Sequence, residues 1–200
     1  MNTAITDFSQ LDLEAVYTYA DYLRWRLEER VELIKGKIFK MSPAPSAKHQ
    51  RLSGRLHFHI FGYVESKKCE VFSAPFDVRL LDKEKSTAEK DIYTVVQPDI
   101  CVICDKQKID ERGCLGAPDL IIEILSKGNS KKEVQTKFEL YQESGVKEYW
   151  VVFPYEQVLQ QFILDPQGKY QLLGMFSEEE TFKAHIFPDL SLDLTKIFVE

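Results

Sequence analysis

The chain has 200 residues, of which 44% are hydrophobic and 29% charged, and its formal net charge is −6. This length fits one globular domain with a sizeable core, and the acidic balance disfavours a protein that coats nucleic acid non-specifically. No apolar run approaches the ~20 residues of a membrane helix. The N-terminus lacks the basic and apolar regions of a secretory signal, so we expect a cytoplasmic protein with no membrane partner.

Helices and short strands alternate in the first half of the chain. Apolar residues at helical intervals predict a helix over residues 12–28, an N-terminal helical segment packed on a single domain that spans 1–200. A tight turn at Lys35-Gly36 predicts a hairpin of strands 31–34 and 37–41. Ser46 is a candidate N-cap for a long helix that runs to about Ser66. The pattern then predicts two strands, near 69–73 and 76–81, and a polar loop over 82–91.

In the second half of the chain, the pattern predicts strands and one further helix. Strands are predicted at 95–104 and 119–125, with the exposed loop 105–113 between them. A capping box from Ser130 to Glu133 opens a helix over 131–144, and Gly145 ends it. A strand at 148–153 precedes a hairpin with strands 158–164 and 170–176, and the last twenty-odd residues add a short strand that closes over the core. The class is α/β, a mixed sheet with helices packed on it.

The four cysteines do not resemble a disulfide framework. Cys69 and Cys114 stand alone in the sequence, and Cys101 and Cys104 lie three residues apart in an apolar strand. Side chains three apart on a strand point to opposite faces, so we interpret the cysteines as core residues rather than as a zinc or redox site.

Two basic stretches interrupt the acidic composition. Lys48, Arg51 and Arg55 recur at helical spacing, and Lys127, Lys131 and Lys132 crowd a second segment. A solvated surface is the favoured interpretation of both groups. A local basic cleft remains compatible with them.

Two carboxylates lie in apolar surroundings, where a charge is costly to bury. Glu123 lies in a segment that is apolar on both faces, Leu120–Leu125, which is typical of a central, doubly covered strand. Asp99 follows Pro98 at the start of another apolar strand. Taken singly, Glu123 could reach water or a lysine at a strand end, and Asp99 could belong to a turn. Together they indicate a shared partner, for which a divalent metal is the natural candidate.

The helix that follows Glu123 adds a lysine. At about 100° per residue, Lys137 falls inside the apolar arc that Leu140, Tyr141, Val134 and Phe138 define. Snorkelling of the side chain, or an i,i+4 pair with Glu133, would explain it without function. The buried acid on the preceding strand favours a functional cation instead.

Two earlier residues are candidates to join this group. Glu32 lies between two apolar residues of a predicted strand, and His49 extends the apolar stripe of the long helix at its N-terminal end. A lone residue of either kind is more often structural. Their interest therefore depends on their neighbours in the fold.

Taken together, these segments resemble a known nuclease pattern. Pro98-Asp99, followed by Glu123 in Ile122–Ser126, is similar to the PD-(D/E)XK nuclease signature. The chain resembles more closely the large bacterial family of putative restriction endonucleases, formerly a domain of unknown function. The resemblance runs from about residue 10 to the C-terminus. It is carried by Val31–Ile38, Met41–Pro45 with His49, Gln97–Ile100, Glu123–Ser126, Asn129-Ser130, Lys137, Tyr141 and Gly145–Trp150.

The chain departs from the general signature at one important position. Where that signature has its lysine, two residues after the second acid, this chain has Leu125. The resemblance implies that Lys137, from the following helix, has taken over that role. Lys127 and Glu133 also stand where the family often has Pro and Asp, and Glu133 keeps the charge.

The resemblance implies a restriction-endonuclease-like fold, a mixed β-sheet flanked by α-helices, and a Mg²⁺-dependent endonuclease that acts on DNA, with Mn²⁺ as an alternative metal. It implies that Asp99, Glu123 and the Ile124 carbonyl hold the metal. Lys137 would then orient the attacking water or stabilise phosphate oxygens, with Glu32 as a further acid and His49 as a positioning residue. A homodimer is expected, since cutting both strands needs two sites.

Two other functions stay open from the sequence. The first is a catalytically inactive scaffold that keeps the nuclease fold and binds nucleic acid or protein. The second is a metal-dependent hydrolase of a small phosphodiester, which would turn over its substrate without any long nucleic acid.

Overall fold

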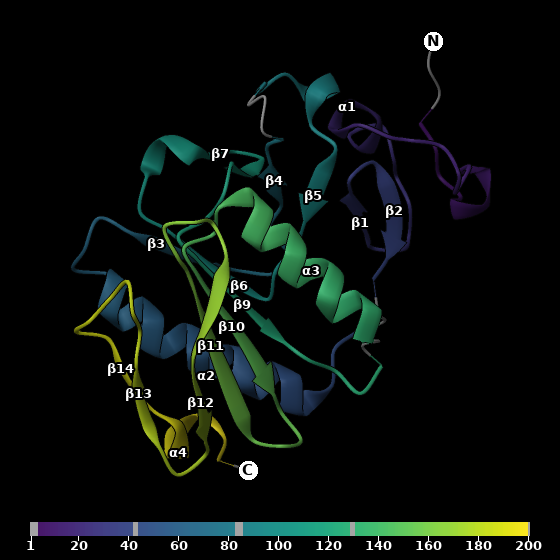
Figure 1. Ribbon diagram of the computed structural model, residues 1–200. Helices are drawn as coiled ribbons and strands as arrows, with labels where there is room; N and C mark the ends of the chain where they lie inside the picture. The colour runs from purple at the N-terminus through teal and green to yellow at the C-terminus, as the bar shows by residue number, and fades with distance from the viewer. Residues whose placement is uncertain (1–3, 42–43, 83–85, 129–130, 200) are drawn as a thin grey trace.

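A mixed central sheet forms the middle layer of the molecule. The computed structural model describes residues 4–41, 44–82, 86–128 and 131–199, and these residues form two six-stranded sheets and one two-stranded sheet (Figure 1). In the central sheet, β9 and β10 are parallel and every other neighbouring pair is antiparallel. Its order is β12 (Tyr170–Ser177), β11 (Val158–Leu164), β10 (Glu148–Phe153), β9 (Leu120–Ile124), β6 (Ile100–Ile103) and β3 (Glu70–Ser73).

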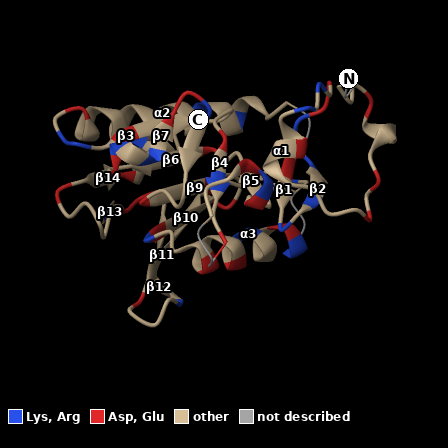
Figure 2. Cartoon of the chain, turned by 90° about the horizontal axis from the view of Figure 1, so that it is seen from above, with Lys and Arg blue, Asp and Glu red and all other residues tan. Residues whose placement is uncertain are grey.

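Two helices cover the two faces of this sheet. Helix α2 (Ala47–Val64) lies on one face and α3 (Lys131–Ser144) on the other, with the strands between them when the molecule is seen from above (Figure 2). All five residues of β9 are buried, as expected for a central strand covered on both sides. The predicted class, an α/β fold with helices on a mixed sheet, is confirmed.

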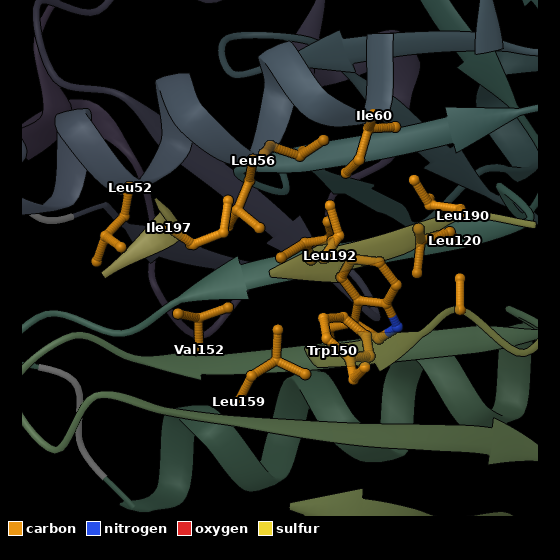
Figure 3. Close-up of a cluster of buried hydrophobic side chains, with 14 of the residues drawn as sticks. Leu52, Leu56, Ile60, Leu120, Trp150, Val152, Leu159, Leu190, Leu192 and Ile197 are labelled. Carbon is orange, nitrogen blue, oxygen red and sulfur yellow. The ribbon is translucent and has the colours of Figure 1, made fainter. Parts of the chain in front are cut away.

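The hydrophobic core on the α2 face is the largest cluster of buried residues. The helix contributes Leu52, Leu56 and Ile60, which pack towards Trp150 and Val152 of the sheet (Figure 3). The C-terminal segment closes this layer with β13 (Thr181–Lys183), β14 (Ser191–Asp193) and α4 (Leu194–Ile197). The prediction of one short closing strand was therefore incomplete, because the segment forms a two-stranded sheet and a helical turn.

The second six-stranded sheet carries one wall of the site. Its order is β2 (Lys37–Lys40), β1 (Val31–Ile34), β5 (Thr94–Val96), β4 (Val78–Leu80), β8 (Gly113–Leu115) and β7 (Ile109–Asp110). The predicted single strand over 95–104 is wrong, because β5 belongs to this sheet whereas β6 belongs to the central one. Pro98 lies where the chain crosses between the sheets, and a proline has no N–H to continue a strand ladder. The crossing brings Asp99 to the junction of the two sheets.

Short elements replace two of the predicted loops. The loop predicted at 105–113 contains the 3₁₀ turn η3 (Lys106–Lys108) and β7, and the loop predicted at 82–91 contains the 3₁₀ turn η2 (Glu89–Asp91). Helix α3 ends before Gly145, whose φ of +84° is the left-handed conformation expected after a helix. The predicted cap residue Ser130 lies outside the described residues.

The helix predicted over 12–28 is wrong. This region contains only the helical turn α1 (Tyr19–Tyr22), preceded by the 3₁₀ turn η1 (Phe8–Gln10). The N–H of Tyr17 donates to the Gly36 carbonyl, and the N–H of Tyr19 donates to the Ile92 carbonyl, so bonds to distant segments interrupt the local turns. The apolar spacing instead reflects aromatic packing, since the rings of Tyr17 and Trp25 lie 5.3 Å apart.

The interpretation of all four cysteines as unpaired core residues is also corrected. Cys69 and Cys104 form a disulfide, whereas Cys101 and Cys114 are free and buried. The two bonded residues flank the paired residues Glu70 and Ile103 of β3 and β6, so the strand register brings them together. A separation of 35 residues in the sequence gives no sign of this pairing. No described helix is long and apolar enough to cross a membrane.

Candidate functional site

Three charged side chains from three elements meet at the junction of the sheets. Glu123 comes from β9, Glu32 from β1 and Lys137 from α3. The Lys137 ammonium donates to the Oε1 atoms of both glutamates, at 3.0 Å in each case. The lysine side chain is only 12% exposed. It therefore points inward, as its place on the helix predicted, and its contacts exclude snorkelling to water as the explanation.

Asp99 lies against the same group, at the end of β9. Its Oδ2 accepts the backbone N–H of Ile124 at 2.7 Å and lies 3.2 Å from Nε2 of His49. His49 stands in the first turn of α2, where Ser46 caps the helix by accepting the His49 N–H. The five predicted side chains, Asp99, Glu123, Lys137, Glu32 and His49, are thus brought together by two sheets and two helices.

Two further residues hold the carboxylates in place. The backbone N–H of Gln97 donates to Glu32 Oε1 at 2.9 Å, and the Tyr141 hydroxyl donates to Glu123 Oε1 at 2.6 Å. The sequence alone assigned neither residue a role. Position could have suggested one, since Gln97 precedes Pro98-Asp99 and Tyr141 lies one helical turn after Lys137.

The surroundings of the site have an excess of negative charge. Burial raises the pKa of Glu123 to about 7, and the nearby Asp99 and Glu32 add to the rise against the opposing effect of Lys137. Burial alone would lower the pKa of Lys137, but the two glutamates outweigh burial and raise it. Burial likewise opposes the charged form of His49, whereas its contact with Asp99 raises the pKa. A cation placed here would offset the repulsion between the carboxylates.

The group faces an open cleft of about 1140 Å³. Its walls come from the ends of α2 and α3, the β1–β2 hairpin and the loops that follow β9 and β10, and they include Arg30, Lys127, Lys132 and Tyr155. A cleft of this size exceeds the usual range for drug-sized ligands. It can therefore admit a large substrate to the acids at its base.

The donor atoms fit a hard divalent cation such as Mg²⁺. Among the described residues, Glu32, Glu123 and Asp99 each have one oxygen that accepts two hydrogen bonds, while their second oxygens take none. No group of three or more His, Cys, Asp or Glu in the described part of the chain could hold a metal by itself. A metal held by fewer protein ligands would need water to complete its coordination, as Mg²⁺ commonly does.

Comparison with known proteins identifies a family and solved structures with a similar fold. The family model Uma2, described as putative restriction endonuclease, matches residues 19–195. A crystal structure of a putative nuclease belonging to DUF820 from Anabaena variabilis ATCC 29413 is 23% identical, with a TM-score of 0.67. The alignment covers 91% of this chain and 97% of that chain, which shows a shared fold. No match is found among curated proteins.

Proposed function

The chain belongs to the Uma2 family of putative restriction endonucleases, and we propose that it is a Mg²⁺-dependent endonuclease that hydrolyses phosphodiester bonds in DNA. One observation carries this proposal. Lys137 bridges Glu32 and Glu123 beside Asp99, at the base of an open cleft. Clustered acids can hold a divalent metal that assists phosphodiester hydrolysis, and a cation beside them can stabilise charge that develops on the phosphate.

Asp99 and Glu123, together with the Ile124 carbonyl, are the groups that would hold the metal. When bound, a divalent metal lowers the pKa of the attacking water and offsets charge on the phosphate. The Ile124 N–H fixes Asp99, and Tyr141 fixes Glu123, so both carboxylates are oriented before any ligand arrives. Such preorganisation is what electrostatic catalysis needs.

Lys137 replaces the lysine that the general nuclease signature places two residues after the second acid. Its ammonium has three donors, of which Glu32 and Glu123 use two. None of the residues that the structure describes accepts the third donor, which can therefore reach a phosphate oxygen or the attacking water. Leu125, at the signature's lysine position, packs partly buried against the core on the α3 face, so α3 must supply the cation.

Metal binding is the first test, because it needs no knowledge of the substrate. Calorimetric titration with Mg²⁺ or Mn²⁺ should show saturable binding to the wild type and none to Asp99→Asn. Asp119→Asn is the matched control. Asp119 is an aspartate as buried as Glu32 and Glu123, but just before β9 it accepts from the Cys104 N–H and from Lys147, away from the site. Loss of binding in both variants, or in neither, would contradict the assignment of the site.

Cleavage assays then separate an enzyme from a scaffold. Asp99→Ala and Glu123→Ala should each abolish metal-dependent cleavage of DNA, while circular dichroism shows an intact fold. Lys137→Met should lower kcat by roughly 10²–10³-fold, the usual cost of removing a transition-state stabiliser. Full activity in either acid variant would refute the metal-holding roles of Asp99 and Glu123, and metal binding without turnover on any nucleic acid would favour a scaffold.

A further inference from the structure

The register of β9 and β10 brings a lysine beside an exposed tyrosine at the mouth of the cleft. The two strands are parallel, and their pairing places Glu123 opposite Val151 and Ile124 opposite Val152. The Leu125 N–H donates to the Val152 carbonyl, so the chains stay together past the strand ends. Four residues beyond Glu123 and Val151 come Lys127 and Tyr155, and the Lys127 ammonium lies 4.5 Å from the centroid of the Tyr155 ring.

A second lysine approaches the same ring from α2. Lys48 precedes His49 in the first turn of that helix, and its ammonium lies 5.4 Å from the Tyr155 centroid. Lys127 is exposed, Lys48 is half-buried, and Tyr155 is 43% exposed. Two basic stretches that the sequence could assign only to solvated surface thus meet at one aromatic side chain.

This arrangement concentrates positive charge at a place where a bound anion would offset the repulsion between the two lysines. Because both ammonium groups lie over one ring, they are within about 10 Å of each other, the Debye length at 0.1 M salt, and they repel. The electron-rich face of the tyrosine attracts both cations and offsets part of that repulsion. Within the described residues, Lys127 makes no ion pair, so its charge remains available to a ligand.

We propose that Lys48, Tyr155 and Lys127 form a clamp for phosphates that flank the scissile one, so that the substrate is a polynucleotide strand rather than a small phosphodiester. This inference rests on the proposed nuclease function and assigns the residues that hold the strand next to the scissile phosphate. Lys127 follows Ile124 by three residues, a span of at most about 10 Å. The clamp therefore lies one or two nucleotides along a strand whose scissile phosphate is at Asp99 and Glu123.

The two lysines and the tyrosine have different roles in the clamp. The two ammonium groups contact phosphate oxygens, while Tyr155 acts through them as a positioning residue. Phosphate contacts of this kind set affinity and register without reading sequence. Each such contact also makes binding more salt-dependent, because a bound lysine releases counterions from the strand.

Binding in the absence of metal tests the clamp independently of catalysis. Fluorescence anisotropy with labelled single- and double-stranded oligonucleotides in EDTA should show several-fold weaker binding for Lys127→Gln and Lys48→Gln. Each variant should also lower the slope of log Kd against log salt by about one. Tyr155→Leu should weaken binding, whereas Tyr155→Phe should restore it, since a phenyl ring keeps the face that attracts the lysines.

Lys169→Gln is the matched control. Lys169 is an exposed lysine at the opposite end of β11 from Tyr155, in the turn before β12. It should leave affinity and salt slope unchanged. Equal effects of Lys127→Gln and Lys169→Gln would overturn the clamp, because they would show a general effect of net charge. A Tyr155→Leu variant that binds like the wild type would show that Tyr155 is not part of the clamp.

Turnover separates failure of the clamp from failure of the nuclease function. With Mn²⁺, Lys127→Gln should raise KM for an oligonucleotide by a larger factor than it affects hydrolysis of bis(p-nitrophenyl) phosphate. Equal losses on both substrates would place Lys127 at the reacting phosphate and overturn the flanking role. If the wild type cleaves neither substrate, the nuclease proposal fails, and the metal-free binding data still decide whether the clamp holds a strand.

Discussion

Two buried glutamates, Glu123 and Glu148, occupy neighbouring parallel strands of the central sheet and have opposite surroundings. Glu148 is 0% exposed and accepts four hydrogen bonds, from the Trp150 indole, the Gln161 amide and the backbone N–H groups of His185 and Ile186. Glu123 is 8% exposed, and both of its hydrogen bonds go to one oxygen.

The difference teaches how to distinguish a structural acid from a functional one. Every donor around Glu148 is neutral and fixed, so the carboxylate is satisfied and ties β10 to the segment before β14. Around Glu123, burial raises the pKa to about 7, and two other acids that lie beside the same lysine add to the rise. Burial alone is therefore not diagnostic, whereas a carboxylate crowded by like charges that raise its pKa is typical of a functional site.

The largest effect on stability should come from Glu148→Ala. Removing the carboxylate leaves four donors without an acceptor, two of them in buried and two in part-buried hydrogen bonds, which should lower the free energy of unfolding by roughly 3–5 kcal/mol. Urea denaturation measures this loss of stability. Glu148→Gln, which keeps one acceptor oxygen, should lose less. A Glu148→Ala variant with the wild-type midpoint would show that this acid does not tie β10 to the C-terminal segment.

The opposite behaviour is expected of Glu123→Gln in metal-free buffer. The folded-state pKa of about 7 lies above the ordinary value of 4.5, so the stability present below pH 4.5 is lost as the pH rises through 7. Glutamine does not ionise. The variant should therefore gain stability relative to the wild type between pH 4.5 and 7, by on the order of 3 kcal/mol.

Denaturation midpoints at pH 4.5 and pH 8 test whether Glu123→Gln gains stability over the wild type as the pH rises. Wild type and Glu123→Gln should be close at the lower pH and differ at the higher one. The same substitution should remove metal binding, so stability and function would move in opposite directions. A difference that does not depend on pH would contradict the account of Glu123 as an acid whose ionised form is disfavoured by burial.

The sequence predicted which charged side chains come together better than it predicted the elements around them. Alternation placed Glu123 on a central strand, and helical spacing placed Lys137 on the inner side of α3; both are local patterns that determine which way a side chain points. The structure brings both residues together with Asp99, Glu32 and His49.

What the sequence could not predict depends on contacts between distant segments. The apolar spacing over 12–28 is real, but backbone hydrogen bonds to Gly36 and Ile92 replace the helix. Pro98 marks a change of sheet, which periodicity cannot distinguish from a strand start. The partners of Glu148 come from 13 to 38 residues away, apart from Trp150, so nothing local distinguishes it from Glu123.

The smallest of these effects should come from Tyr141→Phe, which removes a single hydrogen bond to Glu123. The tyrosine hydroxyl donates to Glu123 at 2.6 Å, and its loss should cost about 1 kcal/mol of stability. Tyr170→Phe is the control, since that hydroxyl donates to the Val146 carbonyl in the same aromatic cluster, away from the acids. Both variants should lose similar stability, but only Tyr141→Phe should weaken Mg²⁺ binding, by roughly 10-fold or more, because it releases a metal-holding carboxylate. Equal metal affinity in the two variants would mean that Tyr141 stabilises the fold without orienting Glu123.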